Sequence, residues 1–227
     1  MAMGAAMGRI AFDIVIFDLD GTLVDTAADL TAALNHSLAS LGRQPLSERA
    51  VRGMVGRGVR TLLHRGLAAT GDTSEALVDT AMPIFLDYYE RHIADHSSPY
   101  PGVEQALTAL DDEGMTLAIC TNKPEALARQ LVAACGWEDR FATIIGGDTL
   151  PVRKPDPAPV REATARAGGG RAVFVGDSIS DTDAARAAGM PCIALTFGFS
   201  DRPPEELGAT ILIDHFDALL PALERLG

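Results

Sequence analysis

The chain has 227 residues and a formal net charge of −12, with 47% hydrophobic but only 5% aromatic residues. This hydrophobic content is enough to bury a sizeable core, which aliphatic side chains must largely fill. The acidic balance argues against a nucleic-acid partner, because nucleic acids favour a basic protein face. It does not exclude an anionic substrate, since a metal ion and a few basic side chains can reverse the charge inside one pocket.

The cysteines and the apolar stretches bear on the compartment. Cys120, Cys135 and Cys192 are odd in number and form no Cys-x-x-Cys pair, which favours reduced thiols in the cytoplasm. No stretch approaches transmembrane length, and residues 1–8 lack the apolar region of a signal peptide. We therefore expect a soluble cytoplasmic protein, monomeric or homodimeric, with no membrane partner. The sequence leaves open whether residues 1–8 belong to the native start.

In chain order, the first predicted strand is the apolar run Ile14–Phe17. A long stretch without a convincing strand follows, from about Thr26 to Ser97. Helical patterns recur within it, at residues 27–41, 47–55, 59–70 and 74–92. Pro99 and the Pro101-Gly102 pair mark the return from this stretch. We predict a bundle of helices inserted directly after the first strand.

The second half of the chain alternates strand-like and helix-like segments. The predicted strands are residues 117–120, 143–145, 172–175, 192–195 and, more weakly, 210–213. The predicted helices between them are residues 124–135, 157–167 and 181–188. Short strands with apolar residues on both faces are typical of a buried parallel sheet. The expected fold class is therefore α/β, with a doubly wound, mostly parallel, Rossmann-like core and an inserted small α-helical domain. The expected boundaries are residues 1–22 and 99–227 for the core and 23–98 for the helical domain.

Two carboxylates, Asp18 and Asp20, directly follow the first strand in the run Asp-Leu-Asp-Gly-Thr-Leu. This arrangement suits phosphoryl transfer through an aspartyl-phosphate, since one carboxylate can attack phosphorus while the other moves a proton. Taken alone, the pair is weak evidence for this chemistry, because Asp-x-Asp-Gly also resembles the start of a calcium-binding loop.

Three further motifs strengthen this interpretation, because ligands bind at the carboxyl ends of the strands in such a sheet. Thr121 and Asn122 end the second core strand, Lys154 follows the third by a short loop, and Asp177 and Asp181 follow the fourth. Each motif alone has a structural alternative: a turn at Asp20, a helix cap at Thr121 or Asp181, or a solvated charge at Lys154. Their ordered placement at four consecutive strand ends favours one shared crevice.

Four aspartates in one crevice repel one another unless a cation is present. Oxygen ligands together with a phosphate suit Mg²⁺, which is the expected cofactor. The metal and Lys154 would neutralise the phosphate of a small anionic phosphate ester. Donors from Thr121 and Asn122 would hold the phosphoryl oxygens.

These motifs resemble those of the haloacid dehalogenase-like hydrolase superfamily over almost the whole chain. The resemblance implies that Asp18 is the nucleophile and a metal ligand. It implies that Asp20 is the general acid/base and that its backbone carbonyl binds the metal. It further implies phosphate binding by Thr121 and Asn122 and stabilisation of the phospho-aspartate by Lys154. By the same resemblance Asp177 ligates Mg²⁺, Asp181 supports the metal site from behind, and the helical domain is a cap.

Within that superfamily the sequence is most similar to bacterial phosphoglycolate phosphatases. The similarity lies in segments 23–26, 55–58, 100–103, 121–124 and 153–155. It implies hydrolysis of 2-phosphoglycolate to glycolate and phosphate. Arg57, in the run Val-Gly-Arg-Gly between two cap helices, is a candidate ligand for the substrate carboxylate. The alternative is that Arg57 is a solvated arginine.

Other functions stay open at this point. The substrate could be another small phosphate ester or pyrophosphate, or the enzyme could be a phosphomutase of the β-phosphoglucomutase type. A non-catalytic regulatory module on the same fold would be expected to lack at least one of the catalytic residues. All of them are present here.

Overall fold

Six parallel strands form the central sheet of the computed structural model, which describes residues 10–200 and 202–227. Their order across the sheet is β5-β4-β1-β6-β7-β8. The strands are β1 (Ile14–Phe17), β4 (Thr116–Cys120), β5 (Thr143–Ile145), β6 (Ala172–Gly176), β7 (Cys192–Leu195) and β8 (Ile211–Ile213). The predicted doubly wound parallel sheet is confirmed. The expectation for residues 1–8 lies outside the described residues.

Strand β1 lies in the middle of the sheet, and this position explains why its sequence is apolar throughout. It pairs in parallel with β4 on one side and β6 on the other, so that Val15 lies between Leu117 and Val173. Val15 and Phe17 join the hydrophobic core on one face of the sheet, whereas Ile14 and Ile16 join the core on the other. Both faces of the sheet at β1 are therefore shielded from solvent, as expected for a parallel sheet covered by helices.

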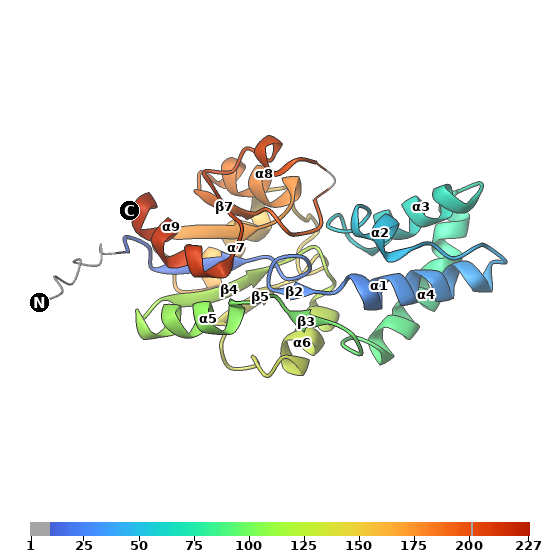
Figure 1. Cartoon of the computed structure of the whole chain (residues 1–227), viewed down its shortest axis with the longest axis horizontal. Coiled ribbons are helices and arrows are strands. Elements are labelled where there is room, and N and C mark those ends of the chain that lie inside the picture. The colour runs from blue at the N-terminus through green and yellow to red at the C-terminus, as the bar shows by residue number, and fades with distance from the viewer. Residues whose placement is uncertain (1–9, 201) are drawn as a thin grey trace, which may run out of the picture.

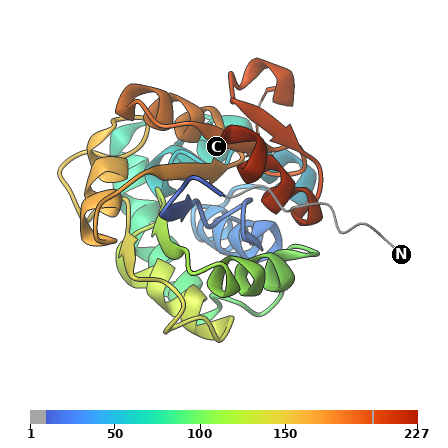
Figure 2. The ribbon, with the colours of Figure 1, turned by 90° about the vertical axis from the view of Figure 1, so that its left-hand side faces the viewer.

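Five helices cover the two faces of this sheet (Figures 1 and 2). They are α5 (Val103–Asp112), α6 (Glu125–Ala134), α7 (Ala158–Arg166), α8 (Ile179–Ala188) and α9 (Leu219–Leu226). The apolar residues of α7 and α8 contribute to one core, and those of α5, α6 and α9 contribute to the other. Short 3₁₀ helices lie at Pro204–Glu206 and Phe216–Ala218.

The predicted insertion is helical, and Figure 1 shows its helices gathered at one end of the molecule, beyond the sheet. We call it the helical insertion (residues 23–98). Its helices are α1 (Ala27–Ser40), α2 (Glu48–Arg52), α3 (Val59–Thr70) and α4 (Glu75–Arg91). Ser47 and Ser74 cap the starts of α2 and α4, where their side chains accept hydrogen bonds from the backbone of Ala50 and Leu77.

The two ends of the helical insertion lie side by side. A short antiparallel ladder joins β2 (Val24–Asp25) to β3 (Ser98–Pro99). Next to it, the buried Asp29 carboxylate near the start of α1 accepts hydrogen bonds from the backbone N–H groups of His96 and Ser97. This double connection is where the chain leaves the sheet and returns, and it supports the proposed division near residues 23 and 98. In the described part of the chain, no helix is long and apolar enough to cross a membrane.

Candidate active site

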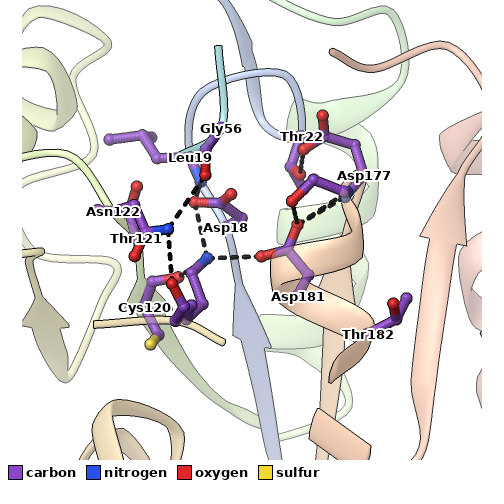
Figure 3. A network of polar contacts seen from close by, with 12 residues as sticks. Asp18, Leu19, Thr22, Gly56, Cys120, Thr121, Asn122, Asp177, Asp181 and Thr182 are labelled. Atoms are coloured by element: carbon purple, nitrogen blue, oxygen red, sulfur yellow. Dashed lines mark hydrogen bonds and ion pairs between the residues drawn. The ribbon is translucent and has the colours of Figure 1, made fainter. Parts of the chain in front are cut away.

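Asp18 lies at the carboxyl end of β1, at the centre of the sheet edge that faces the helical insertion (Figure 3). Its side chain is buried, and its Oδ1 accepts a hydrogen bond of 2.7 Å from the backbone N–H of Leu19. Burial raises the pKa of Asp18 to about 7, with a further increase from Asp181, while the Lys154 ammonium lowers it. The carboxylate is thus costly to ionise in this pocket unless a cation approaches it.

Lys154 reaches the same point from the loop between β5 and α7. Its buried Nζ donates to the Cys120 carbonyl at 2.7 Å and to Asp181 Oδ1 at 2.6 Å, and lies 3.2 Å from Asp18 Oδ1. Burial alone would lower the pKa of Lys154, but the carboxylates of Asp18 and Asp181 raise it above its ordinary value. Lys154 is therefore a fixed positive charge next to Asp18.

Asp177 and Asp181 follow β6 and are fixed by the start of α8. Ser178 is the N-cap of this helix and Asp181 is its third residue, so that Asp181 belongs to a capping box rather than being the N-cap itself. Asp181 Oδ2 accepts hydrogen bonds from the Ser178 hydroxyl at 2.7 Å and from the Ser178 backbone at 2.9 Å. Asp177 accepts from the Thr22 hydroxyl and from the Phe199 backbone, both at 2.6 Å.

Gly198 allows the Phe199 backbone to come this close to Asp177. A Cβ atom at position 198 would lie only 2.1 Å from the Asp177 Cβ. A larger residue at 198 would therefore displace the Asp177 carboxylate.

The three carboxylates of Asp18, Asp177 and Asp181 together fit a divalent cation. One oxygen from each lies within 4.8 Å of the others, and all three residues are buried. The single ammonium of Lys154 pairs with Asp18 and Asp181, so that two negative charges are left to be balanced when all three carboxyl groups are ionised. Burial, with the charges of Asp181 and Asp18, raises the pKa of Asp177 well above its ordinary value. Asp181 is the least available of the three, because one of its oxygens pairs with the Lys154 ammonium at 2.6 Å and the other accepts from the capping box. Asp177 accepts only from neutral donors, which makes it a better candidate for a direct ligand.

Thr121 and Asn122 follow β4, as predicted, and lie beside Asp18. A hydrogen bond from the Thr121 side chain lowers the pKa of Asp18. The Asn122 amide donates to the Gly56 carbonyl and to the Lys154 carbonyl, both at 3.1 Å. Asn122 therefore ties the helical insertion to the Lys154 loop.

Lys123 is a buried residue of this site for which the sequence suggested no role. Its Nζ lies 3.0 Å from Oδ1 and 3.3 Å from Oδ2 of Asp20, and 2.6 Å from the hydroxyl oxygen of Tyr89. Burial lowers the pKa of Lys123, while the carboxylate of Asp20 raises it. One feature of the sequence could have pointed to Lys123. It directly follows the predicted Thr121-Asn122 pair, and a charged side chain that is buried there needs a partner.

A cavity of about 30 Å³ lies between the sheet edge and the helical insertion. The sheet side contributes Asp18, Asp20, Thr121, Asn122 and Lys123. The insertion contributes mostly apolar residues and glycines, namely Leu30, Val55, Gly56, Gly58, Val59, Leu62 and Tyr89. The carboxylates of Asp18 and Asp20 thus share a small space that is lined on the insertion side mostly by apolar residues.

Arg57 lines a second, larger hollow of about 500 Å³. Three other arginines, Arg60, Arg153 and Arg202, line it too, and Lys154 forms part of its wall. Arg60 is engaged by Glu75 and Asp79 on α4. The structure therefore brings together seven of the predicted residues: Asp18, Asp20, Thr121, Asn122, Lys154, Asp177 and Asp181. It places Arg57 apart from them, on a second hollow that Lys154 also lines.

The sequence pattern of the haloacid dehalogenase-like hydrolase family matches residues 15–195, which include every one of these residues except Arg202. The chain belongs to this family.

Relatives within the family narrow the comparison. The chain is 46% identical over 217 residues to a phosphoglycolate phosphatase of Mesorhizobium japonicum, covering 94% of this chain and 96% of that protein. It is 44% identical over 213 residues to a phosphoglycolate phosphatase of Agrobacterium fabrum, covering 92% and 91% of the two chains. The crystal structure of a predicted phosphoglycolate phosphatase from Haemophilus somnus 129pt superposes with a TM-score of 0.88 at 31% identity, covering 95% of this chain and 99% of that one. The predicted resemblance to the family and to its phosphoglycolate phosphatases is confirmed, and with it the prediction of a phosphatase enzyme.

Proposed function

We propose that this protein hydrolyses 2-phosphoglycolate to glycolate and phosphate through a phosphorylated Asp18, with Mg²⁺ as cofactor. The observation on which this rests most is that each of the two carboxylates at the cavity has its own lysine. Asp18 is paired with Lys154, and Asp20 is paired with Lys123. The separate surroundings give the two acids separate tasks.

In the first step, an Asp18 carboxylate oxygen attacks phosphorus. The bond from phosphorus to the glycolate oxygen breaks, and Asp20 gives its proton to that oxygen. In the second step, the ionised Asp20 takes a proton from a water molecule. The resulting hydroxide attacks the phosphorus of phospho-Asp18, and the Asp18–phosphorus bond breaks to release phosphate.

The other side chains of the site stabilise charge in both steps. Lys154 is fixed next to Asp18 by the Cys120 carbonyl and Asp181, so that it can face the developing negative charge without rearranging. Thr121 and Asn122 are proposed to bind the phosphoryl oxygens, and Arg57 is proposed to act on the carboxylate end of the substrate. Asp18, Asp177 and the backbone carbonyl of Asp20 would hold Mg²⁺, which would neutralise negative charge on the phosphate.

Two observations support a small leaving group. The cavity next to Asp18 and Asp20 measures about 30 Å³, room for roughly two water molecules, so that even a small phosphate ester requires the helical insertion to move and a bulky leaving group requires a larger movement. The relatives that are 46% and 44% identical over more than nine-tenths of this chain are both phosphoglycolate phosphatases.

The test is phosphate release with Mg²⁺ across 2-phosphoglycolate, sugar phosphates, nucleotides and pyrophosphate, with Asp18→Asn protein as the blank. We expect kcat/KM for 2-phosphoglycolate to exceed the others by about a hundredfold or more, because a site that makes polar contacts to its substrate discriminates at least this strongly. Equal, weak rates on all substrates would refute 2-phosphoglycolate as the substrate but would not contradict the proposed phosphatase mechanism. Conversion of a sugar phosphate into its isomer without phosphate release would identify a mutase. Equal rates for wild type and Asp18→Asn would refute the mechanism.

A further inference from the structure

Lys123 connects three segments of the chain that are distant in sequence. Lys123 lies in the loop after β4, Asp20 lies in the turn after β1, and Tyr89 lies near the end of α4 in the helical insertion. The Lys123 ammonium is within 3.0 and 3.3 Å of the two Asp20 oxygens and donates to the Tyr89 hydroxyl at 2.6 Å. The three groups therefore form a chain from α4 to the proposed general acid/base.

The three residues that make these contacts are largely buried. The Lys123 side chain is 2% exposed and that of Asp20 is 13% exposed, while Tyr89 as a whole is 1% exposed. A buried ammonium must have its hydrogen bonds satisfied, because water is not there to replace a lost partner. The Tyr89 ring also lies below the ammonium, with its centroid 4.4 Å from Nζ. Tyr89 thus binds Lys123 through both its hydroxyl and its ring.

We propose that Lys123 is a positioning residue that aims the Asp20 carboxylate at the leaving oxygen, and that Tyr89 holds Lys123 in this place from the helical insertion. The proposal rests on the proposed role of Asp20 in proton transfer. It makes proton transfer depend on how α4 lies against the sheet edge, whereas the attack by Asp18 on phosphorus does not depend on Tyr89.

Two small substrates separate positioning from general damage to the site. Ethyl phosphate and acetyl phosphate are similar in size and both lack a carboxylate. The ethoxide group needs a proton to leave, whereas acetate leaves without one, so that only ethyl phosphate depends on Asp20 before phospho-Asp18 forms. In each case kcat/KM reports the steps up to this first irreversible release.

The principal variant is Tyr89→Phe, which removes one hydroxyl and keeps the ring, and the matched control is Tyr88→Phe on the same helix. We expect Tyr89→Phe to lower kcat/KM about tenfold on ethyl phosphate and less than about twofold on acetyl phosphate, a part of the full effect of general acid catalysis. Lys123→Met should lower the ethyl phosphate value about a hundredfold with the same selectivity. Tyr88→Phe should behave as wild type on both substrates.

Asp20→Asn shows whether a negative result concerns positioning or the mechanism itself. If Asp20→Asn is selective for ethyl phosphate, the mechanism stands, and the Asp20→Asn/Tyr89→Phe double variant should lose nothing further. Equal losses on ethyl and acetyl phosphate in Tyr89→Phe would then overturn the positioning proposal. A loss confined to 2-phosphoglycolate would also overturn it, because Lys123 would then bind the substrate carboxylate. If Asp20→Asn itself is not selective, the proposed function fails first.

Discussion

The two buried lysines of the site differ in what fixes them. Lys154 contacts Cys120, Asp18 and Asp181, which all belong to the α/β core outside the helical insertion. Lys123 contacts Asp20 on the sheet side but Tyr89 on the helical insertion. The region around Lys154 is therefore complete within the sheet part of the molecule, and the region around Lys123 requires the insertion. The difference suggests that attack on phosphorus is built into the sheet edge, whereas proton transfer and substrate choice depend on the insertion.

The largest effect is expected from Asp18→Asn in the sheet region. This change removes the attacking carboxylate, so that phosphate release should fall to the rate measured without enzyme and no phosphoenzyme should form. Phosphate release and acid-quench trapping of labelled protein measure both outcomes. Because burial makes the Asp18 charge costly, the metal-free variant should unfold at a temperature no lower than wild type. A stable variant that still forms phosphoenzyme would place the nucleophile elsewhere.

Asp20→Asn tests the second region and should have the next largest effect. Both half-reactions lose their proton carrier, so that kcat on 2-phosphoglycolate should fall by about 10²- to 10⁴-fold. Rapid-quench kinetics should show slow hydrolysis of preformed phospho-Asp18. The matched control is Asp87→Asn, an exposed carboxylate on α4 that pairs with Arg91 and should leave both rates unchanged. Wild-type hydrolysis of the phosphoenzyme in Asp20→Asn would assign the base to another group.

The third prediction concerns the charge excess of the sheet region. The pKa of Asp18 is raised from 3.8 to about 7, so that the folded protein keeps a proton that the unfolded chain releases. The contribution of Asp18 to the stability of the metal-free protein is therefore fully present below about pH 4 and is lost as the pH rises to about 7, by an amount on the order of 4 kcal/mol.

Thermal unfolding with and without Mg²⁺ measures this effect. In EDTA, the midpoint should be lower at pH 8 than at pH 6. The stabilisation by added Mg²⁺ should be larger at pH 8, because a cation replaces the missing protons. A midpoint in EDTA that rises between pH 6 and 8 would contradict the proposed charge balance.

The same two regions differ in how far the sequence alone could describe them. The sheet region could be predicted, because β1, β4, β5, β6 and β7 are buried on both faces and are therefore continuous apolar runs. Their polar residues stand directly after the runs. Strand β8 gives a weaker signal because only Ile213 of its three residues is buried, whereas all three residues of β5, at the opposite edge of the sheet, are buried. Helix α5 was not predicted, although Val103, Ala106, Leu107 and Leu110 have the spacing of one buried helix face.

The second region could not be predicted in the same way. Lys123 and Tyr89 are separated by 34 residues and meet only because α4 packs against the loop after β4. Neither the hydrophobic periodicity nor the spacing of the motifs indicates that contact. The loop at residues 55–58 was correctly expected between two helices, but whether Arg57 reaches the cavity beside Asp18 depends on how the insertion docks. In the structure Arg57 lines the second hollow.

Arg57→Ala is expected to have the smallest effect and to locate the boundary between the two regions. Since Arg57 shares its hollow with Arg60, Arg153 and Arg202 rather than with Asp20, we expect its charge to act on the substrate from a distance. We expect kcat/KM on 2-phosphoglycolate to fall about threefold through KM, with a larger loss at low ionic strength, where charges are less screened. The matched control is Arg91→Ala, which removes an exposed arginine of the same insertion and should change neither constant. A loss above about tenfold that is absent with ethyl phosphate would instead mean that the Arg57 guanidinium binds the substrate carboxylate directly. An unchanged KM at every salt concentration would mean that Arg57 has no part in binding the substrate, and selection of the substrate would then rest on the cavity wall and Lys123.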